Sequence, residues 1–287
     1  MNDTLSVHQQ LQKIINEKKI YPVYQPIVSL KDGSILGYEA LTRISLDSCS
    51  FNIEEMFCYA EQYHCLWELD YICRKEAIKH IQHDIGQKKL FLNVDPNTLN
   101  DSRFQSGMTF TYLDRYHLSP DNIVFEICER TNIQTIETFQ NAVSHYEQQN
   151  YQIAIDDFGK GYAGFNRIFF LHPRYVKLDL SLIRDIDHDS AKRSLIDGLV
   201  KLCHAENICL IAEGIETEAE LTELIQSGID YGQGYFLGKP DKQLQLVPDS
   251  VLATIASENK MIPVEDTHPT FFGNSCNEQP GLKSHHV

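Results

Sequence analysis

Short apolar segments that alternate with stretches of helical periodicity constrain the fold of this chain most. Eight segments have the length and composition of buried strands, and the regions between most of them carry apolar residues at helical spacing. Strands that alternate with helices predict βαβ units and a parallel sheet. The expected strands are 21–30, 34–44, 89–94, 122–128, 151–158, 175–180, 209–214 and 231–237, and the expected helices are 53–63, 66–83, 133–148, 191–204 and 218–226.

The number of strands favours a closed barrel. Eight strands over about 240 residues fit a (β/α)8 barrel better than an open sheet. An open doubly wound sheet stays an alternative, but the Gly-x-Gly-x-x-Gly motif typical of such sheets does not follow the first strand. The first two strands are joined by Lys31-Asp32-Gly33, and Asp-Gly is a strong hairpin signal. We therefore expect an α/β fold, a modified (β/α)8 TIM-type barrel with one antiparallel strand near the N-terminus.

The chain is expected to divide at residue 246. Residues 1–246 carry the strands and helices of the barrel. Residues 247–287 contain four prolines and little periodicity beyond a short helix expected over 250–259. We interpret this part as a C-terminal tail or linker, or as the truncated connection to a further domain.

Composition excludes several classes of protein. The net charge of −15 disfavours duplex nucleic acid and anionic membranes as general partners. No apolar run approaches the ~20 residues of a membrane helix, and no signal peptide is visible, so we expect no membrane insertion. None of the eight cysteines forms a Cys-x-x-Cys pair, which is typical of buried thiols in a reducing compartment. We expect a cytoplasmic protein.

Asp156-Asp157, at the end of an apolar segment, is the most informative local feature. Two carboxylates at the end of a buried strand repel each other and lose hydration unless cations join them. For an isolated pair, a solvated strand end is the better interpretation. The pattern recurs, however, because polar residues interrupt most of the other expected strands: Glu39, Asn93, Glu126, Lys177, Glu213 and Gln233.

In a barrel these residues would converge on the face where such folds hold their active sites. Each alone has a structural interpretation, such as an outward-facing strand residue or a helix cap. Together they do not, because burying so many carboxylates without a metal costs several kcal/mol each. Oxygen ligands without Cys or His favour Mg²⁺ or Mn²⁺ over Zn²⁺. Five carboxylates and an amide can hold two cations ~3.5–4 Å apart, so the pattern predicts a two-metal hydrolase of a phosphate ester.

The sequence resembles the EAL-domain cyclic di-GMP phosphodiesterases over roughly residues 13–240. Glu39-Ala40-Leu41 matches the motif that names this family. Seven other ordered motifs also carry the resemblance: Tyr24-Gln25-Pro26-Ile27, Leu92-Asn93-Val94, Phe125-Glu126-Ile127, Asp156-Asp157-Phe158-Gly159, Val176-Lys177-Leu178-Asp179, Ala212-Glu213-Gly214-Ile215-Glu216-Thr217 and Gln233-Gly234-Tyr235.

The resemblance implies a barrel with one reversed strand, a homodimer, and hydrolysis of cyclic di-GMP to linear pGpG with two Mg²⁺ or Mn²⁺ ions. It thereby implies a part in bacterial signalling that controls biofilm formation and motility. By position in the motifs, the implied metal ligands are Glu39, Asn93, Glu126, Asp156, Asp157 and Glu213, the last through water or as a base. For catalysis, Lys177 would contact the nucleophilic water and Glu216 would be a supporting acid. Gln25 and Arg43 would hold the substrate, and Gln233 would assist the metal and substrate site. Glu129 would anchor the loop after Asp157.

The loop after Asp157 departs from the family pattern. It reads Lys160-Gly161-Tyr162-Ala163-Gly164, where the family usually has Thr or Ala followed by Gly-Tyr-Ser-Ser. The lysine adds a positive charge beside the implied metal site. Two alternatives to the enzyme therefore stay open: a slow or inactive receptor that binds cyclic di-GMP, and a scaffold that uses the barrel for protein contacts.

Overall fold

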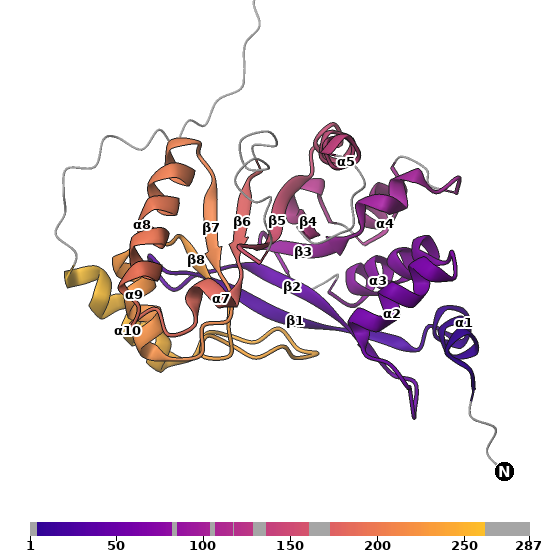
Figure 1. Ribbon diagram of the computed structural model, residues 1–287, viewed down its shortest axis with the longest axis horizontal. Helices are drawn as coiled ribbons and strands as arrows, with labels where there is room; N and C mark the ends of the chain where they lie inside the picture. Colours follow the sequence, from indigo (N-terminus) through magenta and orange to yellow (C-terminus); the bar gives the residue numbers. More distant parts are fainter. Residues whose placement is uncertain are drawn as a thin grey trace, which may run out of the picture.

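A closed barrel forms the centre of the molecule. The computed structural model describes residues 5–81, 85–103, 107–116, 118–128, 136–160 and 173–261. Strands β1 to β8 pair in sequence order, and β8 closes on β1 (Figure 1). The strands are β1 Ile20–Ser29, β2 Ile35–Ile44, β3 Lys89–Val94, β4 Ile123–Cys128, β5 Gln152–Phe158, β6 Tyr175–Leu178, β7 Cys209–Ala212 and β8 Tyr231–Gly232.

Strand β1 is the reversed strand of the barrel. It pairs antiparallel with both β2 and β8, whereas the other neighbouring strands pair in parallel. The Asp32-Gly33 turn joins β1 to β2, and Gly33 has a φ of +74°, which glycine adopts without steric cost. The predicted TIM-type barrel with an early antiparallel strand is confirmed, and closure of the barrel rules out the open sheet.

Helices cover the barrel, and those expected from the sequence are found, the last of them with the expected bounds. They are α2 Ile53–Gln62, α3 Leu66–Ile81, α5 Ile136–Glu147, α8 Ser190–Ala205 and α9 Glu218–Gln226. The structure adds α1 Val7–Glu17, α4 Met108–Arg115, the single turn α7 Leu180–Ile183 and the 3₁₀ turns η1 Pro96–Asn100 and η2 Pro120–Asn122. In α1, the buried residues are only Gln10, Leu11 and Ile14, so its apolar pattern is short.

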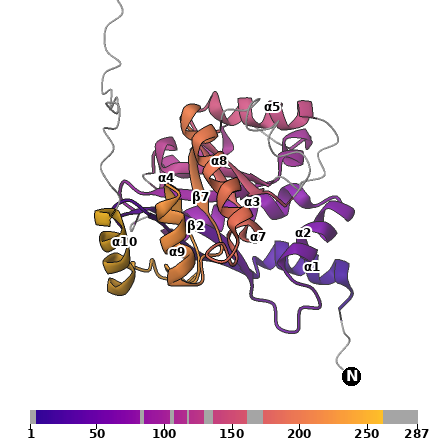
Figure 2. The same cartoon turned by 60° about the vertical axis from the view of Figure 1, so that its left-hand side comes forward.

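Helix α10, Asp249–Met261, lies beside α9 on the outside of the barrel (Figures 1 and 2). Its Val251 and Ile255 are buried, and the Asn259 amide donates a 2.8 Å hydrogen bond to the carbonyl oxygen of Leu30 at the end of β1. The helix expected over 250–259 is therefore docked on the barrel. The division of the chain at residue 246 stays a prediction.

The interior of the barrel has an apolar layer. Ile27, Phe91, Val124, Ala154, Tyr175 and Ile211 form one buried cluster, with one residue from each of β1, β3, β4, β5, β6 and β7. The larger core lies outside this ring, between the strands and the helices. Because successive side chains of a strand point to opposite faces, the residue two positions further on also points into the barrel.

Candidate active site

A polar layer lies directly beyond the apolar layer inside the barrel. Strands β3 to β7 each contribute one residue to the apolar layer, and a predicted site residue follows it by two positions. These site residues are Asn93, Glu126, Asp156, Lys177 and Glu213. Gln233 likewise follows Tyr231 of β8 by two positions. Strand alternation and the shared direction of the parallel strands therefore gather these side chains at one mouth of the barrel.

Lys177 lies at the centre of this layer. Its side chain has no exposed surface, and its Nζ lies 2.8 Å from Glu126 Oε1 and 2.8 Å from Glu213 Oε1. The same atom lies 3.1 Å from Glu39 Oε2 and 3.3 Å from Asp156 Oδ1. One ammonium thus faces four carboxylates, which leaves three negative charges in excess when all are ionised.

Amide side chains fix the position of Glu39. The Gln233 amide donates to Glu39 Oε2 at 2.8 Å and to Gln25 Oε1 at 3.1 Å, and the Asn93 amide donates to Glu39 Oε1 at 3.1 Å. Asn93 also donates to Glu126 Oε2 at 3.2 Å. Gln25 in turn donates to the carbonyl oxygen of Gly238 at 3.0 Å. Amide donors from Asn93 of β3 and from Gln233 after β8 therefore hold two of the carboxylates in place, and Gln25 of β1 orients the Gln233 amide.

The pKa values of the cluster reflect this crowding. Burial, followed by the charge of Glu39, raises the pKa of Glu126 well above its usual value. Burial and the charges of Asp156 and Glu39 raise the pKa of Glu213 to about 8, although Lys177 opposes this shift. For Glu39, the attraction of Lys177 and the hydrogen bonds from Gln233 and Asn93 outweigh burial and lower the pKa. Burial opposes the charge on Lys177, but its four carboxylate neighbours hold its pKa well above the usual value.

The residues present fit a divalent cation by their chemistry. Lysine has three N–H donors for four carboxylates, and the buried oxygens Glu126 Oε1 and Asp156 Oδ1 accept no hydrogen bond although both lie within ion-pair distance of Lys177. Carboxylate and amide oxygens are ligands that Mg²⁺, Mn²⁺ and Ca²⁺ accept. Across the described ranges, no three His, Cys, Asp or Glu side chains stand in an arrangement that would by itself hold a metal ion. The carboxylates converge on Lys177 instead.

A cleft of about 650 Å³ opens above the polar layer. Its lining includes Glu39, Asn93, Asp156, Asp157 and Arg43. Asp157 has a φ of +58°, and the pairing of β5 with β6 shifts register just before it, between Ile155 and Phe158. With strict strand alternation, the side chain of Asp157 would point out of the barrel, opposite to that of Asp156. The irregularity changes this direction, so that Asp157 lines the cleft. Arg43 is half-buried at the cleft, and its Nη1 donates to the carbonyl oxygen of Thr42.

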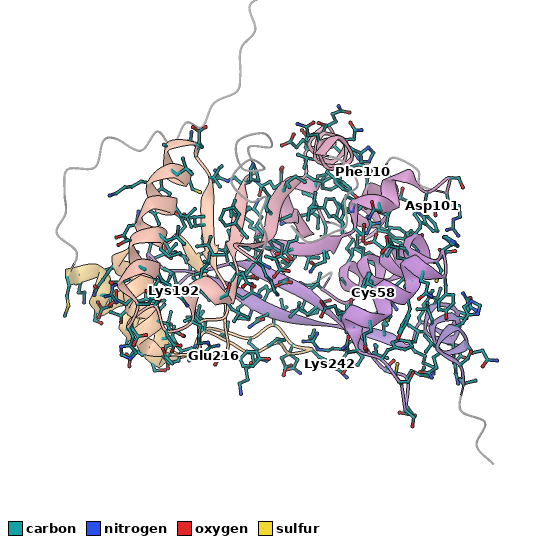
Figure 3. The ribbon with its side chains drawn as sticks, viewed as in Figure 1. Cys58, Asp101, Phe110, Lys192, Glu216 and Lys242 are labelled. Atoms are coloured by element: carbon teal, nitrogen blue, oxygen red, sulfur yellow. The ribbon has the colours of Figure 1, made fainter. Side chains whose placement is uncertain are left out.

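Glu216, a predicted site residue that the structure describes, does not contact this cluster in any interaction given above. The side chain of Glu216 (labelled in Figure 3) is 47% exposed, and each of its carboxylate oxygens lies 2.7 Å from a guanidinium nitrogen of Arg184. Its backbone N–H donates to Glu220 at the start of α9. Glu129 lies outside the described residues, as do the loop positions Gly161 to Gly164.

Sequence reasoning missed a buried ion pair that borders the cleft. Arg74 Nη2 lies 2.7 Å from Asp70 Oδ2 on α3, and Asp70 Oδ1 accepts a 3.4 Å hydrogen bond from the backbone N–H of Asp95, two residues after Asn93. The signal was present, because opposite charges four residues apart on an otherwise apolar helix face form a pair.

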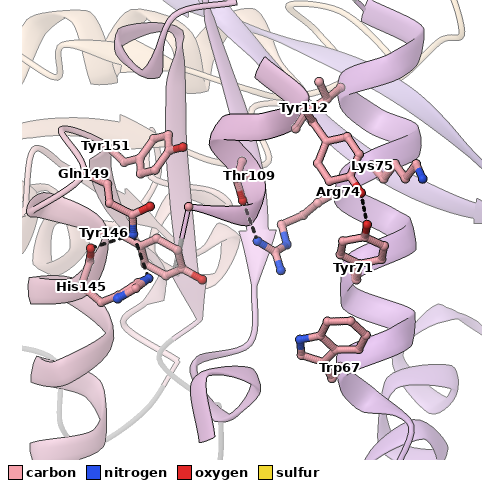
Figure 4. A pocket seen from close by; sticks show the side chains of 12 residues that line it. Trp67, Tyr71, Arg74, Lys75, Thr109, Tyr112, His145, Tyr146, Gln149 and Tyr151 are labelled. Carbon is pink, nitrogen blue, oxygen red and sulfur yellow. Dashed lines mark hydrogen bonds between the residues drawn. The ribbon is translucent and has the colours of Figure 1, made fainter. Parts of the chain in front are cut away.

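Arg74 also lines a second, smaller cavity of about 20 Å³ between α3, α4 and α5 (Figure 4). Three buried polar groups at this cavity, Arg74 Nε and the hydroxyls of Tyr146 and Tyr151, make no hydrogen bond. The volume suits a single water molecule rather than a larger ligand.

The known protein families include one that matches most of the chain. Residues 8–240 match the EAL domain. The chain belongs to the EAL domain family. Among curated EAL relatives, the probable cyclic di-GMP phosphodiesterase PdeG of Escherichia coli strain K12 is 26% identical over 252 residues, which are 86% of this chain and 49% of PdeG. The cyclic di-GMP phosphodiesterase RocR of Pseudomonas aeruginosa is 27% identical over 76% of this chain and 56% of RocR.

Solved structures with an EAL domain have the same fold. A standalone EAL protein from Vibrio cholerae in its c-di-GMP bound form has a TM-score of 0.69 and 28% identity, over 81% of this chain and 97% of that one. BlrP1 of Klebsiella pneumoniae, in a complex with manganese and cy-diGMP, has a TM-score of 0.69 and 27% identity, over 78% of this chain and 56% of BlrP1. The chain spans about a third to a little over half of the length of its curated relatives. In the part of the EAL chain that the structure describes, no helix combines the length and the apolar character needed to cross a membrane.

Proposed function

We propose that this EAL domain hydrolyses one phosphodiester bond of cyclic di-GMP, with divalent cations, and releases linear pGpG. The observation that carries the proposal is the cluster of four buried or half-buried carboxylates around the fully buried Lys177 at the mouth of the barrel. Membership in the EAL family and relatives named as cyclic di-GMP phosphodiesterases support the choice of substrate. The cleft of about 650 Å³ lies within the size range of small-molecule sites.

The proposal gives each residue of the cluster a part. Glu39, Asn93, Glu126, Asp156, Asp157 and Glu213 would hold two Mg²⁺ or Mn²⁺ ions. The ions, when bound, would acidify a water and polarise the scissile phosphate.

The remaining steps rest on side chains of this chain. Lys177 keeps one positive charge among the carboxylates, and it would contact the attacking water through N–H donors that the carboxylates release when they bind cations. Glu213, which lies 2.8 Å from Lys177, would bind a cation through water or accept the proton of the attacking water. Gln25 and Gln233 keep Glu39 in place, and Arg43 at the cleft faces the substrate phosphates. By the family resemblance, Glu216 would be a supporting acid of catalysis, and Glu129 would anchor the loop after Asp157.

The test is incubation of the purified chain with cyclic di-GMP and either Mg²⁺ or Mn²⁺, with and without EDTA, followed by chromatography for pGpG. We expect pGpG only with a divalent cation, and its loss in Glu39→Gln, which keeps the shape of the side chain and removes one ligand charge. Glu17→Gln on the exposed side of α1 is the matched control and should keep the activity. Metal-independent cleavage, or full activity of Glu39→Gln, would refute the proposal.

A receptor that binds cyclic di-GMP without cleaving it is the second candidate. The observation in its favour is Lys160, whose Nζ lies 3.5 Å from Asp157 Oδ1. Binding of cyclic di-GMP without any pGpG in the same assay would establish this alternative. A scaffold role is disfavoured because unused buried carboxylates would destabilise the fold.

We also propose, from the family resemblance, that the chain acts as a homodimer in the bacterial cytoplasm and lowers a second messenger that controls biofilm formation and motility. The barrel would occupy residues 1–246, with 247–287 as an extension whose first part, α10, docks on the barrel. Light scattering coupled to gel filtration tests the dimer, and a monomer at micromolar concentration would contradict it.

A further inference from the structure

Lys160 reaches from the end of β5 into the main cleft. Its ammonium lies 3.5 Å from Asp157 Oδ1 and 3.6 Å from Asp179 Oδ2, and the residue lines the cleft together with Asp156 and Asp157. Its side chain is 38% exposed and turned toward the carboxylates.

Asp179 is held in place by its neighbours, whereas the lysine can move. Asp179 is almost fully buried, and its side chain accepts a 3.0 Å hydrogen bond from the backbone N–H of Ser181 at the start of α7. The backbone N–H of Asp179 donates to Phe158, which ties the ends of β5 and β6 together. Lys160 instead ends in a flexible four-carbon stem, and its ammonium can exchange these contacts for water.

We propose that Lys160 is a built-in competitor for the divalent cation that Asp157 would bind. The inference rests on the proposed function, because it assumes that the cluster takes such cations. An ammonium 3.5 Å from an Asp157 oxygen occupies space that a cation on that oxygen needs, and its charge repels the incoming ion. Lys160 must therefore turn away before Asp157 can serve as a ligand, which lowers the affinity of the site next to Asp157.

The expected effect is moderate and depends on salt. An exposed ion pair is a weak interaction, so removing the ammonium should tighten the weaker cation site by about fivefold at low ionic strength. Screening shortens the range of the interaction to a few ångströms near ~1 M salt, so the difference between wild type and variant should shrink there. A purely structural role of Lys160 would not produce this salt dependence.

The experiment is a calorimetric titration of the full chain with Mn²⁺, without cyclic di-GMP, at about 0.05 M and about 0.5 M KCl. Lys160→Met keeps most of the stem and removes the charge, whereas Lys160→Arg keeps the charge. Lys31→Met, on the exposed β1–β2 turn, changes the net charge equally at the other end of the barrel. Circular dichroism checks that each variant is folded.

We expect tighter Mn²⁺ binding in Lys160→Met alone, and wild-type behaviour in Lys160→Arg and Lys31→Met. Unchanged or weaker binding in Lys160→Met overturns the inference, as does an equal gain in Lys31→Met or the absence of Mn²⁺ binding in every variant. The hydrolysis assay separates this result from the proposed function. If pGpG forms with metal but Lys160→Met has no effect on Mn²⁺ affinity, the proposed hydrolysis is supported and the role of Lys160 is refuted. If Lys160→Met gains Mn²⁺ affinity but no pGpG forms, the role of Lys160 is supported and the proposed hydrolysis is refuted.

Discussion

Replacing Glu213 with glutamine should make the metal-free protein more stable at alkaline pH. Burial and the neighbouring carboxylates raise the pKa of Glu213 to about 8, from an ordinary value of 4.5. The folded state therefore holds this proton more tightly than the unfolded state. The resulting contribution to stability is complete below pH 4.5 and is lost as the pH rises to 8. At 1.36 kcal/mol per pKa unit, the loss between pH 5 and pH 8 is about 4 kcal/mol.

Glutamine imitates the protonated acid and keeps an acceptor for Lys177, so Glu213→Gln should escape this loss. Urea denaturation in EDTA at pH 5 and at pH 8 measures the free energy of unfolding of wild type and variant. We expect similar stability of wild type and variant at pH 5 and a gain of roughly 4 kcal/mol for the variant at pH 8. Mn²⁺ should restore the wild type at pH 8, because a cation replaces the proton. The exposed Glu17→Gln is the control, and the reasoning fails if wild type and Glu213→Gln lose the same stability between the two pH values.

Three further variants probe other contacts of the structure. Lys177→Met should lower the free energy of unfolding in EDTA by about 3–5 kcal/mol, because two buried and two half-buried carboxylates lose their partner, and Mn²⁺ should restore part of it; an unchanged urea midpoint would contradict this. Gly234→Ala should lower the melting temperature, because the added methyl group would lie 2.1 Å from the carbonyl oxygen of Ile215 and overpacking costs about 1–3 kcal/mol; a melting temperature equal to that of wild type would show that the backbone can adjust. Tyr146→Phe should raise the melting temperature by about 3 °C, since its buried hydroxyl makes no hydrogen bond and removing it saves about 1 kcal/mol; a lower value would mean that a water in the small cavity satisfies the hydroxyl.

Local rules explain why the sequence predicted so much of the barrel. The positions of the strands follow from short apolar runs, and the reversed strand follows from the Asp32-Gly33 turn, which joins neighbouring segments and needs no knowledge of the rest of the chain. The polar layer was also predictable, because each of its members follows an apolar residue by two positions on the same strand. Helices α1 and α4 were missed because their apolar stripes are short and gain their stability from packing on the barrel.

The sequence by itself determined which residues can meet at the mouth of the barrel, because strand periodicity and chain direction are local properties. Only the tertiary structure decided how they meet. Lys177 and Glu39 are 138 residues apart, and barrel closure alone makes the lysine the centre of four carboxylates. The same closure turns Glu216 toward Arg184 and brings Lys160 to Asp179. Charge interactions depend on distance through space, and that distance is set by the packing of the whole barrel.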